Sequence, residues 1–247
     1  MKPVILVASD LRENESCIGL RRQYLMSITR AGGLPIMIPI DAEDCDWAWL
    51  FERADGLLIT GGADVDPARY GEAKRPSCGE ILAERERMDF YFARRAREAK
   101  MPVLGICRGC QVMAVDGGGA MWQDIPTDLG IPNERHSQTA PYEVTTHSVD
   151  VEPDSLLARV TGCSGKRAMQ TNSHHHQCVK SLGLDDRLEA VCSEDGVYEG
   201  FSSKTLPFWL GVQWHPEMLS AAHPEAQALF NALVKAAGEF ARTKSAR

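Results

Sequence analysis

Residues 103–111 read Val-Leu-Gly-Ile-Cys-Arg-Gly-Cys-Gln. The apolar residues before the first cysteine predict a buried strand, and we expect a helix to start directly after Cys107. Gly105 and Gly109 stand two positions on either side of that cysteine, where they allow a sharp turn and leave the side chain exposed at the sheet edge. This G-x-nucleophile-x-G arrangement predicts Cys107 as a nucleophile on a strand-to-helix elbow.

The elbow also predicts the groups that would assist the nucleophile. The N-terminus of a helix stabilises a thiolate. The backbone amide of Arg108 is expected to point to where a tetrahedral oxyanion would form. A second donor is expected from Gly62, because the Gly61-Gly62 turn follows a neighbouring strand and active sites in such sheets lie at the carboxyl ends of strands.

Two other interpretations of Cys107 are open. Most free cysteines are ordinary buried thiols, and Cys107-x-x-Cys110 could form a redox or metal pair. A CxxC pair alone is a weak signal, and no second pair completes a zinc site. One helical turn separates the two thiols, which also suits simple packing, so we favour the nucleophile.

The pattern around the elbow predicts an α/β fold with a mostly parallel central sheet flanked by helices. Further strands are expected in the second half of the chain. The strands are predicted at 4–8, 34–40, 56–60, 102–106, 143–151, 188–192, 197–201 and 208–212. Helices are predicted before Gly32-Gly33, around 47–51, over about 80–100, after Cys107 and over 224–241, followed by a frayed basic tail.

Length and composition predict one domain spanning residues 1–247. Apolar residues make up 44% and charged residues 25% of the chain, as in ordinary globular proteins. The net charge of -7 without a long basic run disfavours nucleic acid as a partner. No segment has the length of a membrane span or the features of a signal peptide. The eight cysteines are therefore expected to be reduced thiols in a cytoplasmic protein.

A base for the cysteine is predicted near the C-terminus. The apolar strand at 208–212 leads into Gln-Trp-His-Pro-Glu, residues 213–217. His215 would project from the sheet edge, and Glu217 would accept a hydrogen bond from one ring nitrogen while the other faces Cys107. The alternative is a satisfied structural histidine. The strand end and the nearby carboxylate favour a Cys-His-Glu triad.

Four segments together resemble the class I glutamine amidotransferase-like superfamily, and more narrowly its γ-glutamyl-γ-aminobutyrate hydrolase branch, of peptidase C26 type. They span most of the chain. The resemblance implies a flavodoxin-like sheet and a hydrolase without a cofactor. The segments are Gly-Gly-Ala-Asp-Val-Asp-Pro (61–67), Gly-Ile-Cys-Arg-Gly-Cys-Gln (105–111), Asn-Ser-His-His-His-Gln (172–177) and Gly-Val-Gln-Trp-His-Pro-Glu (211–217).

The resemblance also implies roles by position. Cys107 would be the nucleophile, His215 the base and later the acid, and Glu217 its orienting partner, with oxyanion amides at Gly62 and Arg108. Asp89 and Glu199 fall in family-like positions without a clear role. The residues implied to hold the γ-glutamyl head are Gln111, Ser173, His175 and His176.

The run His174-His175-His176 also invites a metal interpretation. Consecutive residues on a strand alternate between faces, so at most two of the three could share one ligand set. No Asp or Cys stands nearby in the sequence to complete the set. We therefore expect no metal here and favour contact with substrate.

The predicted reaction is hydrolysis of a γ-glutamyl amide to glutamate and an amine, through a thioester on Cys107. The expected partner is a small γ-glutamyl substrate, and a homodimer is left open. One alternative is a glutaminase subunit that hands ammonia to a separate synthase, which uses the same triad. Another is a non-catalytic binding protein on the same fold, which the intact triad disfavours. The leaving amine is not predicted.

Overall fold

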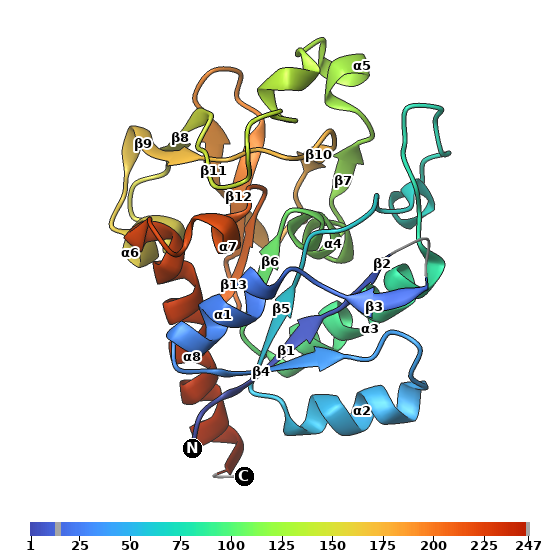
Figure 1. The fold of residues 1–247 in the computed structure, drawn as a ribbon, viewed down its shortest axis with the longest axis vertical. Helices are drawn as coiled ribbons and strands as arrows, with labels where there is room; N and C mark the ends of the chain where they lie inside the picture. The colour runs from blue at the N-terminus through green and yellow to red at the C-terminus, as the bar shows by residue number, and fades with distance from the viewer. Residues whose placement is uncertain (13–15, 246–247) are drawn as a thin grey trace.

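Strands and helices alternate through the first half of the chain, and strands dominate much of the second half (Figure 1). The computed structural model describes residues 1–12 and 16–245. Its strands are Val4–Ala8 (β1), Asp10–Arg12 (β2), Cys17–Gly19 (β3), Leu34–Ile38 (β4), Gly56–Ile59 (β5), Val103–Ile106 (β6), Ala120–Trp122 (β7), His147–Val151 (β8), Gly165–Thr171 (β9), Cys178–Ser181 (β10), Asp186–Cys192 (β11), Tyr198–Ser203 (β12) and Trp209–Val212 (β13). Its helices are Arg22–Arg30 (α1), Asp44–Arg53 (α2), Ala83–Ala99 (α3), Arg108–Asp116 (α4), Ile125–Leu129 (α5), Leu156–Thr161 (α6), Pro216–Leu219 (α7) and Pro224–Ser245 (α8), with short 3₁₀ turns at Pro67–Tyr70 (η1) and Asn133–Arg135 (η2).

Nine of the strands form one sheet in the order β4-β1-β5-β6-β13-β12-β11-β8-β9. The first five in this order pair in parallel. From β13 onward the pairs are antiparallel. The predicted α/β class, with a mostly parallel centre and extra strands in the second half, is thereby confirmed.

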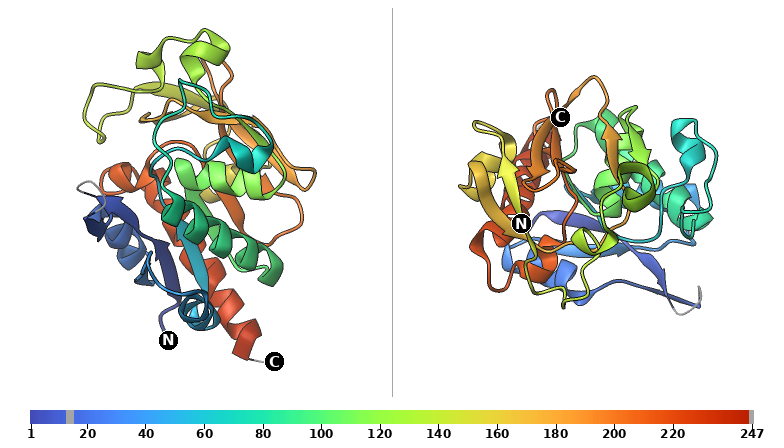
Figure 2. Two further views of the ribbon diagram at one scale, coloured as in Figure 1. Left: turned by 90° about the vertical axis from the view of Figure 1, so that its right-hand side faces the viewer. Right: turned by 90° about the horizontal axis from the view of Figure 1, so that it is seen from above.

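Helices cover both faces of the parallel part of the sheet, which explains its continuous apolar strands. Within β6, Val103 packs into the core shared with α2, α3 and α4. Its neighbour Leu104 packs into the opposite core, which α1 and α8 close. Successive side chains of a strand point to opposite faces, so both must be apolar when both faces are covered. The start of the chain and the end of α8 lie at the end of the molecule opposite α5 (Figure 1; Figure 2, left).

The strand register brings three carboxyl ends together at one edge of the sheet. Ile59 at the end of β5 pairs with Gly105 of β6, and Ile106 at the end of β6 pairs with Val212 of β13. The segments that follow β5, β6 and β13 therefore start side by side. These are the Gly61-Gly62 turn, the elbow at Cys107 and the segment that carries His215.

Several predicted boundaries were wrong. The C-terminal helix does not end at Ala241 but continues to Ser245, where Lys244 donates a hydrogen bond to the carbonyl of Ala54. The strand expected at 143–151 begins only at His147. The edge strand β9 was not predicted, because three of its seven residues are exposed and break the apolar pattern. The segment that carries the three consecutive histidines is not a regular strand.

None of the helices in residues 1–12 and 16–245 combines the length and apolar character that a membrane crossing requires.

Candidate active site

The elbow at Cys107 has the backbone geometry of a strained turn. Cys107 has φ 54° and ψ -111°, a positive φ that is uncommon outside glycine and that occurs at functional sites where the surroundings enforce it. Its amide donates to the carbonyl of Val212 at 2.9 Å, and its carbonyl accepts from the amide of Gln111 at 3.2 Å. These two bonds tie the turn to β13 and α4.

The flanking glycines are required by close packing of the backbone. A Cβ on Gly105 would lie 2.7 Å from the carbonyl carbon of Gly109, and a Cβ on Gly109 would collide with the carbonyl of Ile59. The start of α4 therefore packs directly against the end of β5. This contact places Cys107 beside the Gly61-Gly62 turn, where a Cβ on Gly61 would meet the Cys107 Cβ at 3.5 Å.

His215 and Glu217 come together with Cys107 as the sequence predicts. Nδ1 of His215 lies 2.7 Å from Oε1 of Glu217, and the His215 ring lies beside Cys107 on the wall of the same cavity. Burial by itself lowers the pKa of His215, but the negative charges of Glu217 and Cys107 outweigh it and raise that pKa well above its usual value. The arrangement favours an imidazolium directly beside the Cys107 sulfur, a partner that activates cysteine nucleophiles.

Asn172 holds the backbone of His215 in place. Its Oδ1 accepts from the amide of His215 at 2.8 Å, and its Nδ2 donates to the carbonyl of His215 at 3.1 Å and to that of Tyr142 at 2.6 Å. Asn172 is fully buried. In the sequence, only the family resemblance pointed to the segment of Asn172. No local pattern could reveal this contact, because it joins residues 43 positions apart.

Tyr24 is a positioning residue that the sequence did not reveal. Its hydroxyl accepts from the amide of Gly61 at 3.1 Å and lies within reach of the charge of Glu217. Burial and the charge of Glu217 raise the pKa of Tyr24 well above its usual value, so the phenol stays protonated and can donate. Tyr24 thus holds the glycine turn in place close to the charge of Glu217. Tyr24 lies on the buried face of α1. Its position in the sequence pattern is the same as that of a core residue without such a contact.

Replacing Tyr24 with phenylalanine should lower kcat roughly tenfold, because the buried Gly61 amide beside Cys107 would lose its acceptor, and an unsatisfied buried donor costs about 1–3 kcal/mol. The measurements are steady-state kinetics across pH and thermal unfolding. The matched control is Tyr91→Phe, whose hydroxyl only reaches a carbonyl at the surface at 3.4 Å. A Tyr24→Phe variant with an unchanged kcat and an unchanged pH profile would contradict the positioning role.

A cavity of about 310 Å³ opens above the triad, which is a volume typical of small-molecule sites. One wall is a stack in which the Tyr142 ring lies 3.5 Å from the His174 ring and the Arg21 guanidinium lies 4.0 Å above Tyr142. Burial and the neighbouring charge on His215 lower the pKa of His174 to about 4, so this ring is neutral near pH 7. The cavity is lined by Asp10, Leu11, Arg21, Tyr24, Gly61, Gly62, Ala63, Glu80, Leu82, Cys107, Tyr142, His174 and His215.

The two residues expected to supply oxyanion amides lie beside the nucleophile. Gly62 lines the cavity, and Arg108 is in the first turn of α4, where amides have no acceptor within the helix. The Arg108 side chain turns away from the cavity and forms buried ion pairs with Glu86 and Asp89 of α3. Asp89 therefore has a structural role here, because it fastens the elbow to α3.

The four residues that the resemblance implies hold the γ-glutamyl head do not line this cavity. The Gln111 amide donates to the carbonyl of Gln177 at 3.2 Å, and Ser173 donates to that of His136 at 2.9 Å. His175 is buried next to Glu199. His176 bridges Asp64 and Asp124, at 3.1 Å from each. Of the three consecutive histidines, His174 is the one that lines the cavity.

Comparison with known proteins places this site in a family. The family model of peptidase C26 matches residues 3–217. The γ-glutamyl-γ-aminobutyrate hydrolase PuuD of Escherichia coli strain K12 is 33% identical over 224 residues, which cover 88% of this chain and 85% of that protein. A glutamine amidotransferase-like protein of Rickettsia prowazekii strain Madrid E is 30% identical over 284 residues, covering 95% of this chain and 98% of that protein.

The fold is similarly shared with solved structures. A crystal structure of a protein from Thermoplasma acidophilum, described as one subunit of a GMP synthase, matches with a TM-score of 0.65 at 17% identity. The match covers 99% of this chain and 98% of that one. It bears on the fold, while the family model and the curated relatives bear on the chemistry. The chain belongs to the peptidase C26 family and is an enzyme of the glutamine amidotransferase-like type.

Proposed function

We propose that the chain hydrolyses the γ-glutamyl amide bond of a small γ-glutamyl amine, releasing glutamate and the amine. One observation carries the proposal: His215 contacts both Cys107 and Glu217, at the floor of a cavity sized for a metabolite. The relative from Escherichia coli that is named a γ-glutamyl-γ-aminobutyrate hydrolase supports the choice of reaction.

The proposed reaction has two halves. The Cys107 thiolate attacks the γ-carbonyl carbon, and the amides of Gly62 and Arg108 stabilise the oxyanion. The carbon–nitrogen bond then breaks as imidazolium His215 gives its proton to the leaving amine. Water next loses a proton to neutral His215 and attacks the thioester. The carbon–sulfur bond breaks, which releases glutamate and restores the thiolate.

The charges around the cavity suit the head group of a γ-glutamyl substrate. That head carries an α-carboxylate and an α-ammonium group. Arg21 is a cation on the cavity wall, and Asp10 and Glu80 are acidic residues that line the same space. We assign Arg21 to the α-carboxylate.

Replacing Arg21 with methionine should raise KM by roughly 10–100-fold, because a hydrogen bond to a charged group contributes about 1.5–3 kcal/mol. The change in kcat should be smaller, since the reacting carbonyl lies at the other end of the head group. The measurement is a KM and kcat determination. Arg22→Met is the matched control, because Arg22 is adjacent, exposed and outside the cavity. Equal KM values for the two variants would contradict the assignment of Arg21.

The proposed function is tested with a panel of γ-glutamyl amides assayed for released glutamate. The panel contains γ-glutamyl-γ-aminobutyrate, γ-glutamyl alkylamines, glutamine and the α-glutamyl isomers. We expect unaided hydrolysis of one or more γ-glutamyl amines, faster than that of glutamine, and no hydrolysis of the α-isomers. Activity on glutamine alone that rises when a synthase is added would replace the proposal with a glutaminase subunit. An inert Cys107 toward a diazo-ketone glutamine analogue would favour a binding protein instead.

A further inference from the structure

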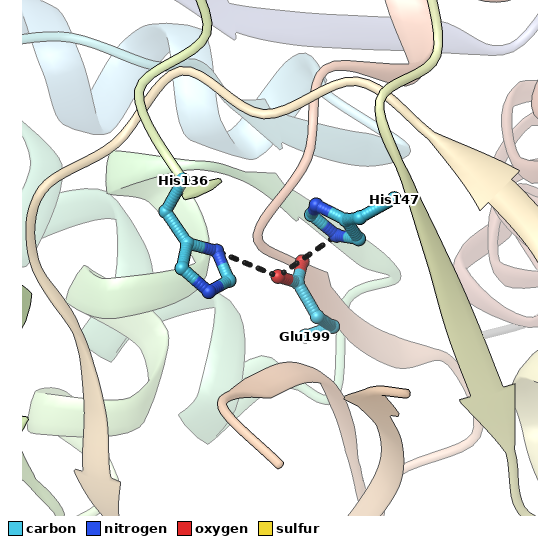
Figure 3. Close-up of side chains that lie close together, drawn as sticks. All are labelled: His136, His147 and Glu199. Carbon is cyan, nitrogen blue, oxygen red and sulfur yellow. Dashed lines mark ion pairs between the residues drawn. The ribbon is translucent and has the colours of Figure 1, made fainter. Parts of the chain in front are cut away.

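A second group of reactive side chains lies outside the cavity and takes no part in the proposed reaction. It surrounds the carboxylate of Glu199, which projects from β12 and is fully buried. His136 follows the turn η2, and His147 begins β8. Figure 3 shows the rings of these two histidines pointing at the carboxylate from different sides. His175, from the segment between β9 and β10, approaches the same carboxylate.

The spacing of these groups is wrong for hydrogen bonds. Oε1 of Glu199 lies 3.3 Å from Nε2 of His147, 3.5 Å from Nδ1 of His136 and 3.7 Å from Nε2 of His175. Hydrogen bonds from nitrogen to oxygen span about 2.7–3.2 Å. Among the described residues, neither oxygen of Glu199 and neither ring nitrogen of His147 has a hydrogen-bond partner. Leaving buried polar groups in that state is costly.

In two of the histidine rings, the nitrogen that faces away from Glu199 already has a hydrogen-bond partner. Nε2 of His136 lies 3.2 Å from the carboxylate of Asp195, and Nδ1 of His175 lies 2.9 Å from the carbonyl of Gln177. Each of these acceptors requires the ring nitrogen next to it to carry a proton. In a neutral ring the other nitrogen, which faces Glu199, then presents a lone pair. Metal-bound histidines show this pattern, with the far N–H donated to a carboxylate or a carbonyl.

Lone pairs and a carboxylate that converge on one point repel each other unless a cation lies between them. The ring nitrogens that face Glu199 therefore need a positive charge between them and the carboxylate. A proton on the ring or a metal ion could supply that charge, and the distances distinguish the two.

We propose that His136, His147 and Glu199 form a binding site for one Zn²⁺-like transition-metal ion. Nδ1 of His136, Nε2 of His147 and Oε1 of Glu199 would be its ligand atoms. In a tetrahedral site with bonds of about 2.0–2.1 Å, neighbouring ligand atoms are about 3.3–3.4 Å apart. The observed 3.3 and 3.5 Å match these edges, and the three groups offer ligand atoms within 4.8 Å of one another. A water molecule would complete the fourth position.

The ion would join loops that build the active-site wall. His136 and His147 bracket the segment that carries Tyr142, and His175 directly follows His174. Tyr142 and His174 stack on each other above His215. The proposed metal is therefore a structural ion that orders the cavity, and the hydrolysis itself does not depend on metal chemistry.

The site is tested by counting metal in protein produced without an affinity tag and with zinc in the growth medium. The Cys107→Ala variant serves as the background, because the Cys107–His215 pair could itself take up zinc. Elemental analysis after extensive dialysis should give about one zinc per chain. Glu199→Gln and His147→Gln should each lose the zinc. His223→Gln should retain it, because His223 pairs with Glu225 at the start of α8, away from this cluster.

A second measurement does not depend on the folding of the variants. The Cys107→Ala protein grown with Co²⁺ in place of zinc should show the intense visible absorption bands of tetrahedral cobalt. Protein that holds well below one equivalent of either metal would overturn the proposal. Metal that is retained in both Glu199→Gln and His147→Gln would place the ion elsewhere and overturn it equally.

Discussion

Replacing Cys107 with alanine is expected to lower kcat for γ-glutamyl amide hydrolysis by roughly 10⁴-fold or more, the range found for other nucleophile deletions. Cys107 lines the cavity and is the thiol that His215 contacts. Without the thiolate no thioester can form, and only the oxyanion amides and substrate binding remain to assist water. The fold should persist, because alanine is smaller and removes no packing partner of the glycine turn.

The matched control is Cys110→Ala. Cys110 lies one helical turn further along α4 and is 2% exposed. Burial and the nearby charge on Cys107 raise its pKa well above the usual value, so it stays a thiol. This variant should keep kcat within a few-fold of the unmodified protein. Glutamate release and mass spectrometry of a trapped γ-glutamyl adduct measure both variants. An adduct on Cys110, or near-normal turnover by Cys107→Ala, would refute the assignment of the nucleophile.

Replacing Glu217 with glutamine is expected to lower kcat by roughly 10³–10⁴-fold, by analogy with the loss of the orienting carboxylate in serine proteases. Glu217 is 1% exposed and lies 2.7 Å from Nδ1 of His215. Its charge is a principal reason that the pKa of His215 is raised. Without this charge, His215 should lose its proton at a lower pH. The alkaline limb of the rate profile, where the imidazolium is lost, should therefore move to lower pH.

The chain supplies its own control for this experiment. Residues 223–225 repeat the tripeptide His-Pro-Glu found at 215–217. There Nδ1 of His223 lies 3.3 Å from Oε1 of Glu225, and both side chains are partly exposed. Glu225→Gln should leave kcat and its pH profile unchanged. If the two substitutions had equal effects on the rate, Glu217 would not be the residue that orients the base.

The parallel core and the elbow could be predicted because their signals are local. Continuous apolar runs reveal strands that are covered on both faces. The glycines around Cys107 are spaced as the turn requires, and the structure shows both pressed against neighbouring backbone. Edge strands with mixed polarity, such as β9, lack such a signal. Their place depends on pairing with strands from other parts of the chain.

The supporting contacts of the site could not be predicted in this way. Tyr24 reaches Gly61 across 37 residues, and Asn172 reaches His215 across 43. The His136, His147 and Glu199 cluster joins three separate segments, and no short motif contains them. A tyrosine on an apolar helix face or a single histidine in a loop has the same local pattern whether or not it faces such a partner.

The two His-Pro-Glu tripeptides illustrate the difference between features that local sequence predicts and features that depend on distant contacts. The alternation of strands and helices, the elbow and the residue types of a triad could be predicted, because they follow from periodicity and from glycine spacing over a few residues. That His215 meets Cys107 while His223 stays at the surface depends on contacts between distant segments. β13 pairs with β6 in parallel, and this pairing brings the ends of two strands, about 100 residues apart in the chain, to the same edge of the sheet.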